Sequence, residues 1–249
     1  MNYFQLIIGQ LKPALHLFSL ILLLGICVNA ICQSNVAITV KGPAGKDINE
    51  LRALYGHNKV YPEEFEKQIL IALSFYPELK DHRVDFQLRK GYAPLSSRPT
   101  YGGLFRSSKK RKYKVFISTG RKDKWDSIIL KSAPFDAGVG VLGHELSHVL
   151  NFSRMSGLSL TGLGISHVST KYMNRFEFLT DSLCIEQGMG NYLLAMSIYA
   201  RKAFGAPDPE QLLVKGEKGN YEERYMSPAT IRRYMADSRV HSMETISGF

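Results

Sequence analysis

One short segment, HELSH at residues 144–148, combines residue types and a spacing that can do chemistry. In a helix, residues four positions apart share a face, with Cβ atoms about 5–6 Å apart, so His144 and His148 can reach one ion. Imidazole nitrogens bind zinc at about 2.0–2.1 Å. Glu145 follows the first histidine and would lie beside the ion, where it can act on water without being a ligand. The spacing therefore predicts a zinc site with Glu145 as its base.

A catalytic zinc site needs a third protein ligand and an open fourth position. A third histidine six residues after the second is excluded, because Arg154 stands there. Glu177 and Asp181 lie four residues apart in a helical pattern, so they present two carboxylates on one face. His167 is the rival third ligand, and it lies in a segment rich in Gly, Ser and Thr.

These two motifs resemble those of the gluzincins, zinc peptidases with H-E-x-x-H on one helix and E-x-x-x-D on a later one. The chain is similar to the minimal gluzincin group and to the prenyl-protein and heat-shock zinc endopeptidases over residues 143–187. The resemblance implies one Zn²⁺ ion with Glu177 as the third ligand, and Asp181 as the partner of a ligand histidine. Thr180 departs from the family pattern, which has a smaller residue there.

The resemblance implies a metallopeptidase in which Glu145 takes a proton from water and later gives one to the departing amine. A strand near the active helix commonly holds the substrate by main-chain pairing, and residues 113–118 are the candidate. His167, Tyr172 and Tyr225 are candidates to polarise the substrate carbonyl.

Two other functions stay open. A hydrolase of a non-peptide bond would use the same metal and base. A non-enzymatic module that binds the cell envelope or a polyanion could keep zinc as a structural staple. The second alternative is disfavoured, because structural zinc sites usually have four protein ligands and are rich in Cys.

The HELSH segment must lie on a buried helix, since residues 137–151 are apolar on more than one side. Asp136 is the candidate N-cap of this helix. Gly138, Gly140 and Gly143 each cost about 1 kcal/mol relative to Ala inside a helix. Three such residues predict that another element approaches the helix closely.

The remaining elements follow from hydrophobic periodicity and from Gly and Pro positions. They predict an α+β, zincin-like fold: a small twisted sheet, the buried HELSH helix, a second helix with Glu177, and a helical C-terminal part that closes the cleft. The expected helices are 48–55, 62–76, 175–187 with Gly188 as its stop, and 192–204, with further helix starts at Pro209 and Pro228; the strands are 84–88 and 113–118, and residues 153–173 form a loop.

The N-terminal segment carries one charged residue, Lys12, ahead of the apolar stretch 18–32. This stretch is shorter than the roughly 20 residues that cross a bilayer comfortably, so residues 1–32 predict a signal peptide, with small residues for cleavage at 28–30. An uncleaved membrane anchor over 14–32 is the alternative. Either interpretation predicts export, to the periplasm or outside the cell.

The chain of 249 residues is 45% hydrophobic and 22% charged, which excludes disordered, collagen-like and coiled-coil proteins. After residues 1–32, one domain over 33–249 is expected, with the core of the zinc site at about 113–188. Of the three cysteines only Cys184 lies in that domain, so it cannot form an internal disulfide there and is expected to be a buried apolar residue.

The net charge of +10 is concentrated in one tract. Residues 86–122 contain eleven Lys or Arg and no acid, and six of the eleven fall in 106–114. Such a tract is usually a solvated hairpin end, but it could attract an anionic envelope or membrane surface, or an acidic substrate. Nucleic acid is disfavoured as a partner by the export signal and by the lack of a recognised binding motif.

Overall fold

The computed structural model describes residues 47–91, 93–103, 106–107, 110–120, 124–166, 169–205 and 223–247. The predicted signal peptide, the helix start at Pro209 and His167 lie outside these ranges. Within them the fold is a mixture of α and β, mostly helical with one small sheet, which agrees with the predicted α+β class. None of the helices in the described ranges combines the length and the hydropathy needed to span a bilayer.

The sheet has four strands in the spatial order β1-β2-β4-β3. β1, β2 and β4 run parallel, and β3 pairs antiparallel with β4. Val84, Phe86 and Val115 in the central strands are buried and the residues between them are partly exposed, as the alternation predicts, but Leu88 near the end of β2 is 46% exposed. The strands are β1 Lys59–Val60, β2 Arg83–Arg89, β3 Leu95–Pro99 and β4 Lys112–Ser118.

The prediction that residues 113–118 form the strand that pairs with the substrate was wrong. These residues form β4, which is paired on both sides, and the edge beside the HELSH helix is β3. β3 reads LSSRP and only Leu95 in it is buried, so it has no apolar alternation to reveal it. It is held by main-chain pairing to β4, which a sequence pattern does not record.

The helices confirm most of the expected positions. The segment 62–76 forms a 3₁₀ turn followed by α3, and Gly188 ends the Glu177 helix in a left-handed conformation with φ +88°. The α-helices are α2 Ile48–Tyr55, α3 Glu66–Ser74, α4 Phe135–Arg154, α5 Gly157–Ser166, α6 Thr170–Cys184, α7 Gly190–Ala203 and α8 Pro228–Ser247, with a π-helical turn at Ile185–Met189 and 3₁₀ turns at Glu63–Phe65, Pro77–Leu79, Tyr101–Gly103 and Lys124–Ile128.

Two local predictions were wrong. Residues 153–173 are largely helical, because Leu160 and Leu163 are three positions apart and bury one face of α5 despite the surrounding Gly and Ser. The cap of α4 is Pro134, and Asp136 lies inside the first turn. The fixed φ of proline suits entry into a helix, and the carboxylate still interacts favourably with the helix dipole there.

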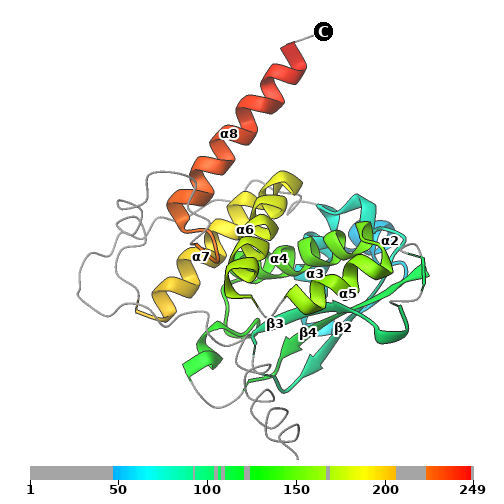
Figure 1. The fold of residues 1–249 in the computed structure, drawn as a ribbon. Helices are drawn as coiled ribbons and strands as arrows, with labels where there is room; N and C mark the ends of the chain where they lie inside the picture. Colours follow the sequence, from blue (N-terminus) through cyan, green and yellow to red (C-terminus); the bar gives the residue numbers. More distant parts are fainter. Residues whose placement is uncertain are drawn as a thin grey trace, which may run out of the picture.

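α4 runs through the middle of the molecule, with α3 beside it and the strands beneath both (Figure 1). The predicted close approach occurs on its glycine face. A Cβ at Gly140 would overlap the carbonyl oxygen of Tyr192 on α7, and one at Gly143 would overlap the Met189 side chain. On another side, the Tyr76 hydroxyl donates to the Gly143 carbonyl at 2.6 Å. α4 is therefore fixed from several sides before any ligand binds.

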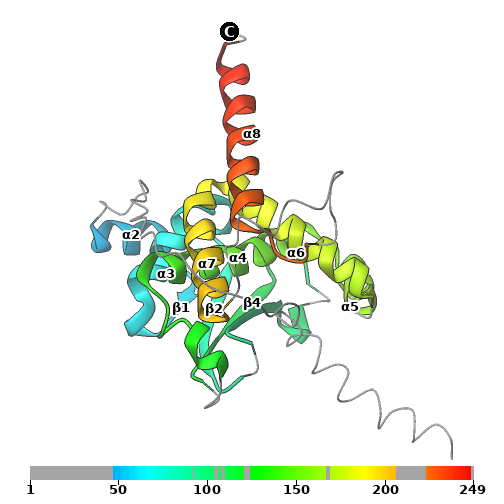
Figure 2. The same ribbon diagram turned by 90° about the vertical axis from the view of Figure 1, so that its left-hand side faces the viewer.

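The helical C-terminal part consists of α7 and α8. α7 packs along α4, whereas most of α8 extends away from the body in both views (Figures 1 and 2). The start of α8 was predicted correctly: Ser227 Oγ accepts from the Thr230 amide at 3.2 Å, with Pro228 at the first position. The segment that lies against the HELSH helix is the short stretch 223–227 that leads into α8.

Candidate metal centre

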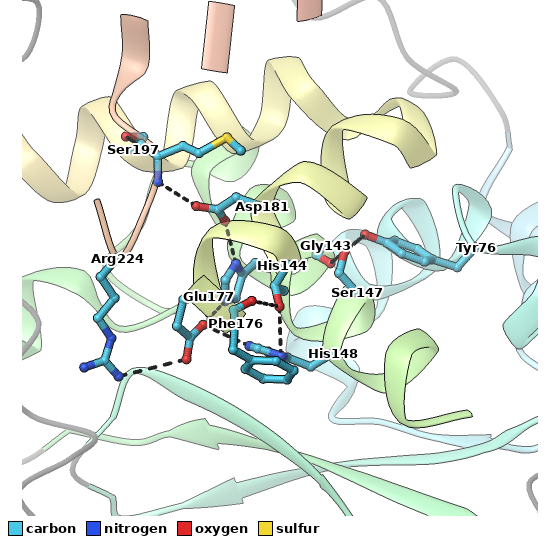
Figure 3. A network of polar contacts seen from close by, with 12 residues as sticks. Tyr76, Gly143, His144, Ser147, His148, Phe176, Glu177, Asp181, Ser197 and Arg224 are labelled. Carbon is cyan, nitrogen blue, oxygen red and sulfur yellow. Dashed lines mark hydrogen bonds and ion pairs between the residues drawn. The ribbon is translucent and has the colours of Figure 1, made fainter. Parts of the chain in front are cut away.

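Three side chains from two helices converge on one point between α4 and α6 (Figure 3). Glu177 Oε2 lies 3.2 Å from His144 Nε2 and 3.2 Å from His148 Nε2. The three ligand atoms lie within 4.8 Å of one another, and all three residues are buried. The helical spacing explains this geometry, since His144 and His148 occupy successive turns of α4 and Glu177 faces both from α6. This group could hold one metal ion.

The other nitrogen of His144 is held by Asp181. Asp181 Oδ1 lies 2.8 Å from His144 Nδ1, and Oδ2 accepts the main-chain N–H of Met226 at 2.8 Å. Asp181 is 1% exposed, so both contacts are shielded from water. A carboxylate that accepts from Nδ1–H leaves the Nε2 lone pair directed at the convergence point, which is the usual arrangement around a metal-binding histidine.

The other nitrogen of His148 lies against Thr180. Thr180 Oγ1 donates its only proton to the Phe176 carbonyl at 2.9 Å. The same oxygen lies 3.3 Å from His148 Nδ1, and with its proton directed at Phe176 it can accept there from Nδ1–H. His148 Nε2 is then the nitrogen that faces Glu177, where a cation could take the place of a proton. The outer nitrogen of each histidine thus has an oxygen partner, which is the usual arrangement around metal-binding histidines.

Glu145 directly follows His144 on α4 and is not one of the three convergent ligands. Its side chain is buried, and Oε2 makes no hydrogen bond to any residue that the structure describes. Such a group needs an explanation, because buried carboxylate oxygens are normally paired. The backbone of Glu145 is held in place, since Ser97 Oγ on β3 donates to its carbonyl at 3.2 Å. A buried carboxylate without a hydrogen bond, on the residue after a convergent histidine, suits a group that acts on water.

The charges around the centre favour a cation. Burial alone would lower the pKa of His144, but the hydrogen bonds and charges of Asp181 and Glu177 outweigh burial and raise that pKa well above its usual value. Burial would raise the pKa of Glu177, but the charge of His148 and the hydrogen bonds of both histidines hold that pKa well below its usual range. A site that binds a proton this strongly also favours a metal cation in its place.

The donor set fits zinc among common metals. Two imidazoles and one carboxylate form the three-ligand set of catalytic zinc sites, whereas calcium and magnesium prefer oxygen ligands alone. The described part of the chain places no cysteine with these ligands, because Cys184 is fully buried in the hydrophobic core, as expected. Burial raises the pKa of the Cys184 thiol to about 12, so it is an inert core group.

The residues predicted to polarise the substrate carbonyl lie at different distances from the centre. The Tyr225 ring lies 5.6 Å from the His144 ring, which brings it to the centre. Tyr172 is further away, since its ring stacks on Phe176, which in turn stacks on His148. His167 lies outside the described residues, so its place is not known. Burial and the charge of Glu177 raise the pKa of Tyr225 well above its usual value, so its hydroxyl keeps its proton and can donate it.

Sequence reasoning missed three groups that the fold brings to the centre. Arg224 Nη2 lies 4.0 Å from Glu177 Oε1, on the side of the carboxylate away from the histidines. The Met226 amide binds Asp181, and Thr180 binds His148. Arg224 and Met226 lie outside the predicted site core 113–188, and main-chain donors carry no residue signature. The candidate Tyr225 and the helix start at Pro228 were the two sequence predictions that fell on or next to this segment.

Comparison with known proteins adds no relative. No protein-family model matches the chain, and neither the curated proteins nor the solved structures contain a match. The argument for function therefore rests on the residues and geometry described above.

Proposed function

We propose that this chain is a zinc-dependent metallopeptidase that works outside the cytoplasm. One observation carries the proposal: His144, His148 and Glu177 converge on one buried point, and Glu145, the residue after His144 on α4, has a buried Oε2 that makes no hydrogen bond within the described residues. The three convergent residues would hold the ion. A zinc ion held in this way lowers the pKa of water towards about 7 and polarises a carbonyl group.

Glu145 has the main chemical role among the residues of the chain. Its Oε2 accepts a proton from the attacking water and then delivers it to the departing amine. The carboxylate is suited to this task because it is held on a rigid helix and makes no competing hydrogen bond within the described residues. Tyr225 supports the same step if its hydroxyl donates to the oxygen of the scissile carbonyl, as the position of its ring beside His144 allows.

The open edge of β3 supports a peptide as the substrate. β3 ends the sheet on the side that contacts α4, and Ser97 joins it to the backbone of Glu145. An extended peptide can add to such an edge by main-chain hydrogen bonds, which would align its scissile bond with the centre. A hydrolase of small non-peptide molecules has no need for this edge, so the peptidase is preferred over that alternative.

Export is supported by the sequence alone. The apolar segment at 18–32 has the length and flanks of a signal peptide, and cleavage there would release the domain from residue 33 onwards. An anchor over residues 14–32 would keep the same domain at the membrane surface. In both cases substrates would be proteins or peptides of the cell envelope or of the exterior.

The decisive experiment compares the parent chain with Glu145→Gln. The protein is expressed in full, its zinc content is measured, and a broad peptide library is searched for cleavage products by mass spectrometry. We expect one zinc per chain in both proteins, chelator-sensitive cleavage by the parent, and a rate at least about 100-fold lower for the variant. Glu64→Gln, which makes the same change at an exposed position far from the centre in sequence, should behave like the parent.

Each outcome has a clear meaning. Cleavage that survives in Glu145→Gln, or zinc loss in that variant, contradicts the role of Glu145. Zinc binding by the parent without cleavage of any peptide favours the alternative of a structural zinc in a binding module. Absence of zinc from the parent overturns the proposal as a whole.

A further inference from the structure

A second region of the molecule has the features of a binding site and plays no part in the proposed peptidase reaction. It is a surface pocket of about 480 Å³ at the start of β2 and β4 and at the turn that follows β3. Six charged residues line it: Arg83, Arg106, Lys110, Lys112, Lys114 and Asp85. Five cations and one carboxylate give the pocket wall a net charge of +4.

Strand register gathers these charges on one face of the sheet. β2 and β4 are parallel neighbours in which Arg83 lies opposite Lys112, and Asp85 lies opposite Lys114. Side chains alternate along a strand, so the intervening residues, such as Val84, point into the core on the opposite face. α3 and α4 cover that core face in both views (Figures 1 and 2), which leaves the charged face to solvent.

The cations of the pocket have no carboxylate partners in the described part of the chain. None of the five lies within ion-pair distance of an acidic side chain there, and Asp85 pairs with none of them. The one printed polar contact of Lys114 is to the neutral Gln87 side chain at 3.3 Å. Unpaired like charges this close repel one another, and a bound anion relieves that repulsion.

The wall of the pocket is fixed by a buried arginine. Arg111 is 1% exposed, although it belongs to the basic run that suggested a solvated hairpin end. Its guanidinium donates to the carbonyls of Gly103 and Arg106 in the pocket loop, at 3.1 and 3.3 Å, and to Phe152 and Met155 at the end of α4, at 2.8 and 3.0 Å. The loop is thus attached to the core, so the pocket is built into the fold.

Gly103 shows how tightly that loop is packed. A Cβ at this position would lie 2.9 Å from Arg111 Cγ and 2.9 Å from Thr100 Oγ1. The Thr100 amide donates to the Lys112 carbonyl at 2.9 Å, which joins the turn to β4. The main chain on one side of the pocket is therefore set by contacts that do not depend on a ligand.

We propose that this pocket binds a molecule that carries two or more neighbouring phosphate groups. A single carboxylate brings one negative charge, whereas a phosphate group brings up to two and accepts hydrogen bonds from the Arg fork and from Lys. The pocket, at about 480 Å³, has room for a ligand larger than a single phosphate group, since one water molecule takes about 30 Å³ in the liquid. Four excess positive charges in this volume suit a compact oligophosphate or a lipid headgroup with clustered phosphates.

The test separates these two sources of phosphate. The full-length zinc-loaded protein is titrated with sodium tripolyphosphate by calorimetry at low salt, and is sedimented with phosphatidylcholine vesicles that contain cardiolipin. The pocket variant is Lys112→Gln with Lys114→Gln. The matched control is Lys131→Gln with Lys202→Gln, which removes the same charge from exposed positions outside the pocket.

We expect the pocket variant to bind at least about 10-fold more weakly than the parent, with the control pair unchanged and the zinc content equal in all three proteins. Loss of tripolyphosphate binding identifies a soluble phosphate ligand, and loss of vesicle binding alone identifies a headgroup. Raising the salt should weaken either interaction, because exposed charges are screened. Equal weakening in the control pair, or no binding of either probe by the parent, overturns the proposal without bearing on the peptidase.

Discussion

The metal centre and the basic pocket are two polar regions built in opposite ways. The centre is closed: His144 and His148 are 5% and 7% exposed, and each has a partner for its outer nitrogen. The pocket is open, and its cations have no described carboxylate partner. In the centre the outer nitrogen of each histidine has an oxygen neighbour within 3.3 Å, whereas the charges of the pocket have no such fixed ionic partner in the described residues.

This difference predicts how each region responds to change. Binding at the centre depends on a few short contacts in a dry environment, so single isosteric substitutions should have large effects and salt should have little. Binding at the pocket depends on the summed charge, so single substitutions should have modest effects and salt a large one.

Glu177→Gln should have the largest effect. The amide keeps the size of the side chain but removes the negative charge that faces both histidines at 3.2 Å. We expect zinc affinity to fall by more than about 1000-fold, beyond the 10- to 100-fold that an outer partner is worth. Competition with a chromophoric chelator measures the zinc affinity. Anion binding at the pocket should be unchanged, and a parallel loss there would show that the two regions are coupled.

Arg111→Met should affect the pocket and the fold but spare the centre. The methionine leaves four carbonyls without the guanidinium that they now share, so we expect the free energy of unfolding in urea to fall by about 3 kcal/mol. Phosphate binding should weaken as the loop loosens, while zinc affinity stays within about twofold.

Arg83→Met is the matched control for Arg111→Met. Arg83 lines the same pocket from an exposed position on β2, so its loss should weaken phosphate binding and change the unfolding free energy by less than about 0.5 kcal/mol. Equal stability losses in the two variants would mean that the buried arginine is no anchor.

The same contrast explains what the sequence could predict. The HELSH spacing and the pair Glu177 and Asp181 are local patterns on single helices, so helical geometry alone brought each set onto one face. The glycines of α4 correctly predicted that another element approaches this helix closely. Their neighbours are a carbonyl on α7 and a side chain in the π-helical turn, and tertiary packing alone decides which elements these are.

Other features depend on main-chain or long-range contacts and left no readable pattern. β3 pairs through its backbone, so the polar LSSRP segment was not predicted as a strand and the substrate-binding edge was assigned to the apolar strand 113–118. Arg111 looked like one more cation in a basic run, yet it is buried and donates to two carbonyls, of Phe152 and Met155, that are 41 and 44 residues away in the sequence. Composition therefore predicted the charge of this region correctly but could not tell which arginine is structural.

Asp181→Asn tests the outer partner of His144. An amide has one acceptor oxygen, so it cannot accept from both His144 Nδ1 and the Met226 amide, as the two carboxylate oxygens do. We expect zinc affinity to fall by about 10- to 100-fold, less than for Glu177→Gln. Asp237→Asn on the exposed side of α8 is the control and should have no effect. An equal loss in both proteins would point to a global change.

Thr180→Val should have the smallest effect at the centre, because Thr180 is a neutral partner at a longer distance. Valine has the shape of threonine but cannot accept from His148 Nδ1, which would leave that N–H buried without its partner. We expect zinc affinity to fall by about 10-fold, at the lower end of the range for outer partners. Thr180→Ser keeps the hydroxyl and should recover most of the affinity.

The imidazole signals of His148 give a readout that simple loss of packing would not move. In the zinc-loaded parent, nitrogen NMR should show the Nδ1–H tautomer, and Thr180→Ser should keep it. A valine variant with full zinc affinity and the same tautomer would show that zinc and Glu177 orient His148 without help. In that case the two histidines differ in kind: Asp181 positions His144, and His148 is positioned by the metal itself.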